Sequence, residues 1–307
     1  MLRLECGRWP HRRVPLGMEQ QTFTKDDGAT LSYSVLGSTD AASTLVCHPG
    51  GPGTSGAYFG DLCGLGSRDL RVILFNPRGT GASSPPVDGR YELEEYAADL
   101  DALRRQLGLQ RIDLLGHSHG GFVGMVYALS YRERLGRLAL VCSAARFSSE
   151  LREEAEAAFA THRDRPWFED AREAQRRRRA WDFSSPQEAG ALYAREARLW
   201  FANDGPESEA FLDEFAQQRP DLEALRYFND RLAAAYDLRP RLGEIDVPTL
   251  VVNGVCDFFG PRISARELAA IPNSRVAVIP DAGHFVFAEA PQRFRAELEA
   301  FLAARNA

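Results

Sequence analysis

The feature of this sequence that most limits its possible folds is the segment Gly-His-Ser-His-Gly-Gly at residues 116–121. It follows the apolar run 112–115 and precedes the helix-forming segment 122–131, so it marks a turn from a strand into a helix. Glycines on both sides permit a sharp, strained turn, because larger side chains would collide with the strand and the helix. Such a turn raises the Ser118 hydroxyl above the sheet, at a helix N-terminus that favours negative charge. We therefore predict that Ser118 is a nucleophile; the alternative is a glycine-rich turn without chemistry.

A serine nucleophile needs a histidine base that is held by an acid, and with this type of turn the expected chain order is serine, acid, histidine. Of the six histidines, only His284 lies in a loop after the last predicted strand, and Asp257 directly follows the strand before it. Asp281 is a rival acid, but a neighbour three residues away in the same loop orients an imidazole poorly. The predicted triad is Ser118, Asp257 and His284. The alternative for Asp257 is an aspartate in a turn or at a helix N-cap, and the alternative for His284 is a histidine in a surface loop.

The loop His-Pro-Gly-Gly-Pro-Gly at residues 48–53 follows an earlier predicted strand and is a candidate for binding an oxyanion. A tetrahedral intermediate needs preorganised N–H donors. One donor is predicted to be the backbone amide of His119, directly after the nucleophile. The other is predicted to be Gly51, with Gly50 as the second choice, because a glycine lets bare backbone approach the substrate. The alternative is a tight glycine-proline turn with no further role.

Alternation of apolar runs with helical patterns predicts an α/β fold with a mostly parallel sheet flanked by helices. Continuous apolar strands are typical of a parallel sheet that is covered on both faces. Residues 54–68 leave room for a further helix. The apolar runs that predict strands begin at residues 43, 70, 112, 137, 247 and 274, and the predicted helices are 91–108, 122–131, 263–271 and 291–305.

The pattern breaks between residues 146 and 241, where charged helix-forming residues and aromatic residues dominate and no strong strand occurs. We interpret 146–241 as an all-helical cap, inserted into a core that consists of 20–145 and 242–307. Residues 1–19 are expected to be a disordered N-terminal extension. Four consecutive arginines at 176–179 are interpreted as a solvated helix face.

Composition excludes several classes of protein. The 307 residues are 44% hydrophobic and 26% charged, which is typical of a soluble globular chain. A net charge of −6 argues against a nucleic-acid partner, and no run approaches the roughly 20 apolar residues of a membrane helix. The five cysteines form no C-x-x-C pair, and the N-terminus lacks a signal-peptide pattern, so a cytoplasmic protein with reduced thiols is expected. With no metal-binding histidine motif and no P-loop lysine, no cofactor or metal is expected.

These motifs together resemble the α/β-hydrolase fold and, more narrowly, the proline iminopeptidase family of serine aminopeptidases. Pro-Gly-Gly-Pro-Gly at 49–53 is similar to the family's H-G-G-P-G, and Asn-Pro-Arg-Gly-Thr-Gly at 76–81 resembles its D-x-R-G-x-G. The resemblance implies the triad predicted above, a helical cap over the active site, and removal of an N-terminal residue, often proline. Two positions depart from the pattern: Pro49 replaces the family's histidine, and Phe258 stands where one relative has a glutamate. Arg78, within 76–81, is expected to brace neighbouring loops.

The leading functional hypothesis is a serine aminopeptidase or aminoacyl-amide hydrolase. The rivals are a carboxylesterase or lactonase with the same triad, a hydrolase that removes an aminoacyl group from a natural-product intermediate, and a non-enzymatic binder. The expected substrate is a small peptide, amide or ester, and the sequence does not predict an oligomeric state. A buried substrate ammonium needs a carboxylate partner. The candidates are Glu196, Asp230 and Glu214 in the cap, and Trp200 and Phe258 are expected to contact substrate. If the wall around Ser118 has no carboxylate besides Asp257, the esterase hypothesis takes precedence.

Overall fold

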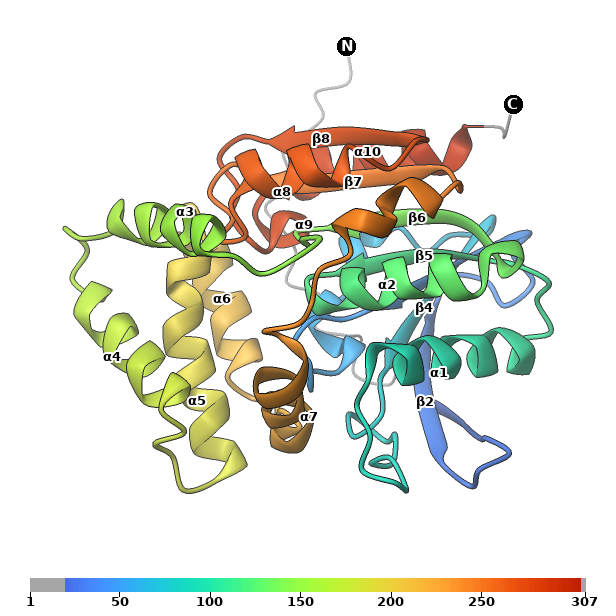
Figure 1. Ribbon diagram of the computed structural model, residues 1–307, viewed down its shortest axis with the longest axis horizontal. Coiled ribbons are helices and arrows are strands. Elements are labelled where there is room, and N and C mark those ends of the chain that lie inside the picture. The colour runs from blue at the N-terminus through green and yellow to red at the C-terminus, as the bar shows by residue number, and fades with distance from the viewer. Residues whose placement is uncertain (1–19, 305–307) are drawn as a thin grey trace, which may run out of the picture.

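The computed structural model describes residues 20–304, which form an eight-stranded sheet with helices on both faces (Figure 1). The strand order is β1-β2-β4-β3-β5-β6-β7-β8; β2 pairs antiparallel with both β1 and β4, and the other pairs are parallel. The predicted mostly parallel α/β sheet is thus confirmed. The strands are β1 (Gln20–Thr24), β2 (Thr30–Leu36), β3 (Ser43–His48), β4 (Leu70–Asn76), β5 (Ile112–His117), β6 (Leu135–Val141), β7 (Thr249–Gly254) and β8 (Ser274–Ile279).

Side chains of the central strands alternate between two apolar cores, one on each face of the sheet. In β3, Val46 belongs to the core that includes Leu100, whereas Leu45 and Cys47 belong to the core that includes Phe294. This alternation is the period of two that a pleated strand imposes. One core is covered by α1 (Leu93–Gln106), α2 (His119–Ser130) and α8 (Pro261–Leu268), and the other by α9 (Val286–Glu289) and α10 (Pro291–Ala303).

Between β6 and β7 the described chain is helical and lies beside the carboxyl ends of the parallel strands (Figure 1). The ends of this insertion meet: Arg146 forms a β-bridge with Asp237, and the backbone N–H of Leu238 donates to the carbonyl of Ala145 at 2.8 Å. The helices are α3 (Ser149–Ala160), α4 (Phe168–Arg179), α5 (Pro186–Ala197), α6 (Pro206–Phe215) and α7 (Leu222–Tyr227), followed by a π-helical turn (Phe228–Leu232).

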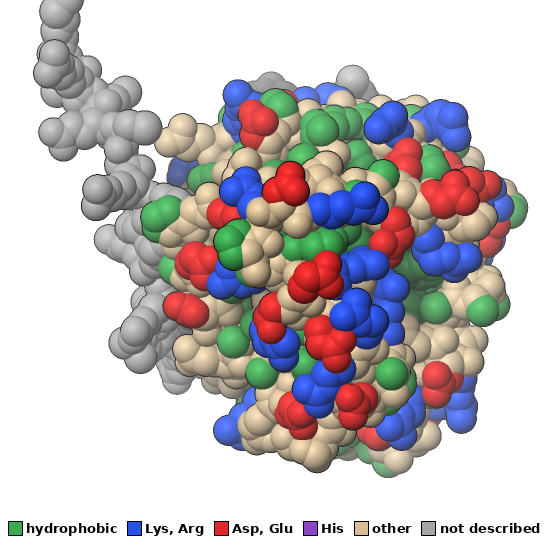
Figure 2. Space-filling view, turned by 90° about the vertical axis from the view of Figure 1, so that its left-hand side faces the viewer, with side chains coloured by type: hydrophobic (Ala, Val, Ile, Leu, Met, Phe, Trp, Pro, Cys, Tyr) green, Lys and Arg blue, Asp and Glu red, His purple; other side chains and the backbone are tan. Residues whose placement is uncertain are grey.

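Local sequence explains where several of these helices begin. The side-chain oxygens of Ser148, Ser185 and Asp221 accept backbone N–H bonds at the starts of α3, α5 and α7. Such N-caps satisfy donors that the helix itself leaves free. On the face shown in Figure 2, acidic and basic side chains are interspersed. Among the inserted helices, the ion pairs Arg195–Asp170 and Arg198–Glu209 join neighbouring segments.

The structure differs from the sequence expectations at residues 54–68 and at the N-terminal hairpin. Residues 54–68 form two short 3-10 helices, Gly56–Phe59 and Leu62–Gly64, instead of an α-helix. The glycines explain this: Gly60 and Gly64 have positive φ angles, and a Cβ on Gly56 would lie 2.6 Å from the Phe75 carbonyl oxygen. The hairpin β1–β2 was not predicted, and the expected extension 1–19 lies outside the described residues. Within 20–304, no helix combines the length and apolarity that a membrane span requires.

Candidate active site

Ser118 lies on the predicted sharp turn between β5 and α2. Its backbone has φ 55° and ψ −120°, and its N–H donates to the carbonyl of Val141 at 2.9 Å. A Cβ on Gly116 would lie 2.2 Å from the Gly120 carbonyl oxygen, and one on Gly120 would lie 2.3 Å from the carbonyl oxygen of His48. Both glycines are therefore required by packing. A non-glycine residue held at positive φ by its surroundings is typical of a functional site.

Asp257 and His284 meet after β7 and β8. The Nδ1–H of His284 donates to Asp257 Oδ1 at 2.8 Å, and both side chains are almost fully buried. Asp257 also accepts bonds from the Phe259 backbone N–H at 3.2 Å and from Asn253 Nδ2 at 3.4 Å. The rival Asp281 is exposed. This arrangement orients the His284 ring and leaves its Nε2 as the nitrogen that can exchange a proton.

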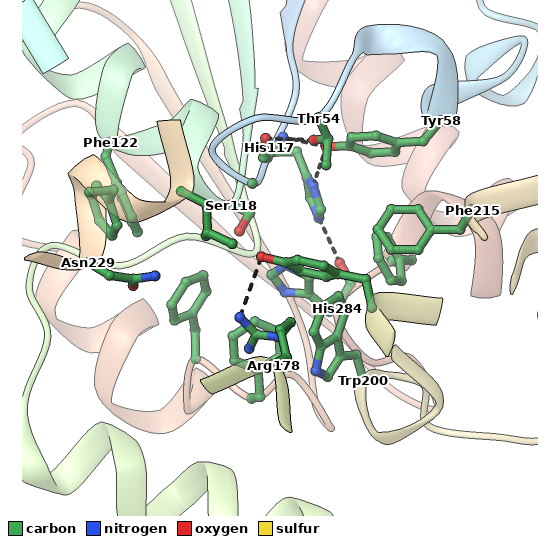
Figure 3. A pocket seen from close by; sticks show the side chains of 18 of the residues that line it. Thr54, Tyr58, His117, Ser118, Phe122, Arg178, Trp200, Phe215, Asn229 and His284 are labelled. Carbon is green, nitrogen blue, oxygen red and sulfur yellow. Dashed lines mark hydrogen bonds between the residues drawn. The ribbon is translucent and has the colours of Figure 1, made fainter. Parts of the chain in front are cut away.

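A cavity between the sheet and the cap has Ser118 and His284 in its wall (Figure 3). Of the residues that we predicted for substrate contact, Gly50, Gly51, Trp200 and Phe258 also line it. The His284 ring packs against Phe258, with the ring centroids 4.2 Å apart. The remaining wall is mostly aromatic and consists of Phe122, Phe147, Phe215, Phe228, Phe259, Phe285, Leu225, Thr54, Tyr58, His117, Tyr193, Arg178 and Asn229.

The predicted cap carboxylates do not reach this cavity. Glu196 is buried, but its Oε1 accepts bonds from Gln175 Nε2 at 3.1 Å and Arg178 Nη2 at 3.0 Å, and its Oε2 accepts from Arg178 Nε. Asp230 is exposed on the π-helical turn, and Glu214 is half-buried on α6. None of the described residues that line the cavity is an aspartate or a glutamate. The expectation that one of these three residues faces Ser118 is therefore wrong.

Arg178 is a cavity residue that the sequence analysis missed. Arg176 and Arg179 are exposed, as expected for a solvated face, but Arg178 lies in the cavity wall. It follows Ala171 and Ala174, both fully buried, at helical spacing on α4. That spacing was the available signal that one arginine of the run points inward.

The loop after β3 approaches Ser118 closely. A Cβ on Gly50 would lie 2.9 Å from the Ser118 Cβ, and the Gly50 N–H already donates to the Tyr58 hydroxyl at 2.6 Å. Gly51 has φ 115°. Within residues 20–304, the backbone N–H groups of Gly51 and His119 have no hydrogen-bond partner in the protein. These two amides are therefore free to bind a ligand oxygen, which fits the oxyanion prediction.

The His119 side chain has a packing role rather than a place in the cavity wall. Its ring lies 5.2 Å, centroid to centroid, from both Tyr96 and Phe228. Complete burial lowers the pKa of His119 well below its usual value, so the ring is neutral. Only the backbone amide of this residue is available for chemistry at Ser118.

A hydrogen-bond chain joins the Gly50 loop to the loop that carries His284. The His284 carbonyl can only accept, so His117 Nε2–H donates to it, at 2.9 Å. His117 Nδ1 then accepts from the Tyr58 hydroxyl at 2.7 Å, and Tyr58 in turn accepts from the Gly50 N–H. Burial lowers the pKa of His117 well below its usual value and keeps it in this neutral form. In this series of hydrogen bonds, the Gly50 N–H, the Tyr58 hydroxyl and both His117 ring nitrogens each have a partner.

The neutral form of His117 also bears on metal binding. One of its ring nitrogens, the Cys142 Sγ and one ring nitrogen of His284 lie within 4.8 Å of one another. Both His117 nitrogens are hydrogen-bonded, and His284 Nδ1 is held by Asp257. Burial raises the pKa of the Cys142 thiol far above its usual value, so the thiolate that a metal requires is disfavoured. The hydrogen bonds of the two histidines and the neutral thiol therefore do not favour metal ligation at this cluster.

Replacing Tyr58 with phenylalanine tests the Tyr58–His117 chain. We expect kcat to fall about tenfold, with little change in KM, because the Gly50 N–H and His117 Nδ1 lose their partner and both loops gain freedom. The matched control is Tyr33→Phe, which removes a hydroxyl that donates to Gln21 on the β1–β2 hairpin, away from the cavity. An unchanged kcat in Tyr58→Phe, with only a lower melting temperature, would give the chain a purely structural role.

Glu289 in α9 ties the His284 loop to the cap. Its carboxylate accepts from the backbone N–H groups of Ala202 at 2.7 Å and Gly283 at 2.8 Å. Desolvation raises the pKa of Glu289 to about 7. A second tie is the bond from the His284 N–H to the Trp200 carbonyl, at 2.7 Å. The cap and the predicted base are thus positioned together.

Arg78 braces neighbouring loops, as expected. Its Nε donates to Asp99 at 2.7 Å, and its Nη1 and Nη2 donate to the backbone carbonyls of Arg90 and Glu95 at 2.8 and 3.0 Å. The buried pair with Asp99 holds the loop after β4 against α1. Nothing in this arrangement brings Arg78 to the cavity wall.

Comparison with known proteins identifies the fold family. The family model for the alpha/beta hydrolase fold matches residues 43–291. A proline iminopeptidase from Lactobacillus delbrueckii subsp. lactis is 27% identical over 296 residues, covering 87% of this chain and 92% of the relative. The putative carbamate hydrolase RutD from Pseudomonas syringae pv. syringae is 30% identical over 283 residues, covering 85% and 94%.

Solved structures agree with the same assignment. A thermophilic esterase from Thermogutta terrifontis superimposes with a TM-score of 0.70 at 25% identity, over 92% of this chain and 98% of the esterase. Its likeness and the family match extend across both the sheet and the inserted helices. The chain belongs to the alpha/beta hydrolase fold family, and it is similar to members named as peptidases, carbamate hydrolases and esterases.

Proposed function

We propose that this protein is a serine hydrolase that cleaves a carboxylic ester or lactone with an apolar, uncharged acyl group. In the proposed reaction the Ser118 oxygen attacks the ester carbonyl while His284, oriented by Asp257, takes the hydroxyl proton. The N–H groups of Gly51 and His119 bind the oxyanion. His284 then protonates the departing alcohol, which leaves an acyl-enzyme. Water loses a proton to His284 and attacks the acyl carbon, and the Ser118 oxygen leaves with that proton.

The observation that carries this proposal is the character of the cavity wall. Its described residues are mostly aromatic and include no carboxylate, and its charged member is the cation Arg178. An α-ammonium group next to Ser118 would be desolvated without a counter-ion, which costs several kcal/mol. An ester or lactone carries no such charge. Its apolar acyl group would gain from burial against the aromatic side chains.

A second candidate is the hydrolysis of an aminoacyl amide or N-terminal peptide bond. Similarity to relatives named proline iminopeptidase favours it, and the motifs at 49–53 and 76–81 resemble that family. The same three residues would carry out this reaction. It requires a counter-ion for the substrate amine, and Glu196 cannot serve without giving up its bonds to Arg178 and Gln175.

A panel of chromogenic substrates separates the two candidates. We expect 4-nitrophenyl esters of four- to eight-carbon acids to be hydrolysed with kcat/KM about a hundredfold or more above that of prolyl and alanyl 4-nitroanilides. Two factors contribute to this difference. The anilides carry an ammonium group that would be buried without a counter-ion, and each 1.4 kcal/mol of that cost lowers kcat/KM about tenfold. The esters also have the better leaving group. To isolate the charge, each anilide is also compared with its N-acetyl form, which should react at least as fast.

The opposite pattern would establish the aminopeptidase. Free-amine anilides would then be good substrates, and N-acetylation would abolish their hydrolysis. Absence of turnover with every ester and anilide, in protein that is folded by circular dichroism, would contradict both candidates.

A further inference from the structure

Arg178 has one edge of its guanidinium held by the cap and another without a strong partner. Its Nε and Nη2 donate to Glu196, which Gln175 also contacts. Its Nη1 is 3.5 Å from the Tyr193 hydroxyl, the outer limit for a hydrogen bond. The guanidinium carbon lies 4.6 Å from the centre of the Tyr193 ring, so this ring fixes its plane.

The free edge lies at the same cavity as Ser118 and His284. Figure 3 shows Arg178 on the opposite side of the cavity from Thr54 and Tyr58. The Thr54 hydroxyl is committed to the Gly50 carbonyl at 2.7 Å, and Tyr58 is committed to His117. Arg178 therefore retains donor capacity at this mostly aromatic wall, as do the Asn229 side-chain amide and the Tyr193 hydroxyl, and of these three donors Arg178 is the cation.

Stability alone does not account for the ion pair between Arg178 and Glu196. A buried pair pays a desolvation cost, and replacing both members with apolar residues is often neutral or stabilising. The neighbouring positions on this face of α4, Ala171 and Ala174, are small and apolar. The Arg178 side chain is only 15% exposed and that of Glu196 only 2%. A largely buried arginine at a cavity wall, whose Nη1 has only one long hydrogen bond, is suited to binding a ligand oxygen.

We infer that Arg178 recognises a neutral oxygen acceptor on the acyl group of the substrate, at a distance from the scissile carbonyl. This inference rests on the proposed function and makes the substrate an ester or lactone of an oxygenated, otherwise apolar acid, such as a keto acid. The acceptor is neutral because Glu196 already balances the charge of Arg178. A carboxylate would leave a net negative charge among the aromatic side chains, which is unfavourable.

The test compares matched acyl chains. We would measure kcat/KM for 4-nitrophenyl esters of hexanoic, heptanoic and octanoic acids, and for the same acids with a keto group at carbon 4 or 5, and at carbon 6 in the two longer chains. The monoester of adipic acid adds a carboxylate probe. The readout is the kcat/KM of the keto ester divided by the kcat/KM of the alkyl ester of equal length. We expect this ratio to be about ten or more for one keto position, as for other polar groups that a site is built to hydrogen-bond.

Two variants remove the donor in different ways. Arg178→Leu combined with Glu196→Leu deletes both charges, so that neither remains buried alone, and should lower the ratio to about one. Arg178→Lys keeps a charge for Glu196 but loses the planar fork and should also reduce the ratio. The matched control, Arg176→Leu with Glu173→Leu, deletes an exposed ion pair on the same helix and should leave the ratio unchanged.

Several outcomes would overturn the inference. They are a wild-type ratio of one or less at every keto position, a ratio that persists in the folded double variant, or a preference for the adipate monoester that depends on Arg178. If the Arg178→Leu, Glu196→Leu variant does not fold, the ratio measured for Arg178→Lys decides: an unchanged ratio overturns the inference. A high ratio confined to wild type and the control would support the inference.

A second readout keeps this test separate from the proposed function. Phosphonofluoridates with the same alkyl and keto chains form a bond from the Ser118 oxygen to phosphorus, while fluoride leaves and His284 takes the hydroxyl proton. If no ester is turned over, the proposed function fails. The Arg178-dependent difference in labelling rate between keto and alkyl chains then still supports or overturns the inference.

Discussion

Ser118→Ala is expected to lower kcat for the best ester by about 10⁶, because the nucleophile of the proposed acyl-enzyme is lost. Its thermal unfolding should stay close to that of the wild type. The Ser118 hydroxyl has no hydrogen bond to another described residue, and alanine keeps the Cβ that the turn already accommodates. The measurement is steady-state hydrolysis together with phosphonofluoridate labelling followed by intact-protein mass spectrometry, and the variant should take up no label.

Ser130→Ala provides the control for this prediction. Ser130 is the exposed last residue of α2, the helix that begins directly after Ser118. Its variant should retain full activity and full labelling. If Ser118→Ala kept more than a few per cent of the wild-type activity in pure protein, another nucleophile would have to be sought.

The strand-to-helix turn could be predicted because steric requirements appear directly in the sequence. Gly116 and Gly120 meet backbone atoms at distances that exclude any Cβ, so the turn needs glycine at both positions. The central parallel strands were equally readable, since they are buried on both faces and their runs are mostly apolar. The hairpin β1–β2 could not be predicted in this way, because β1 is exposed at four of its five residues and lacks an apolar run.

The cavity wall was harder to predict than the triad because it depends on tertiary packing. Glu196 and Trp200 are four residues apart, a spacing that would place them on one face of a continuous helix, but α5 ends at Ala197 and a 3-10 turn follows. Trp200 consequently reaches the cavity, while Glu196 turns toward α4 and pairs with Arg178. Composition marked 176–179 as a charged run, and beyond the spacing from Ala171 and Ala174, the packing of α4 against α5 distinguishes its third arginine. This part of the cavity wall thus depends on contacts between the inserted helices, which a linear motif does not record.

Asp257→Asn is expected to reduce kcat by about 10⁴, the second largest effect of these predictions. Asp257 accepts bonds from His284 Nδ1, the Phe259 N–H and Asn253 Nδ2. An asparagine offers one oxygen and one NH₂ group, so at least one of these donors would face another donor. If the amide nitrogen faces His284, it favours the tautomer with the proton on Nε2, which cannot accept the Ser118 proton. The loss of negative charge also removes the partner of the imidazolium that forms during attack.

Asp281→Asn separates this effect from a general change of charge near His284. Asp281 is exposed, and His284 is paired with Asp257 instead. We therefore expect Asp281→Asn to change kcat less than about twofold, in line with the small effects of most surface substitutions. Melting temperatures of both variants would show whether each is folded, and the pH dependence of kcat/KM would report the ionisation of the remaining base. A large loss in Asp281→Asn with little loss in Asp257→Asn would mean that the loop rearranges during catalysis and that the acid is Asp281.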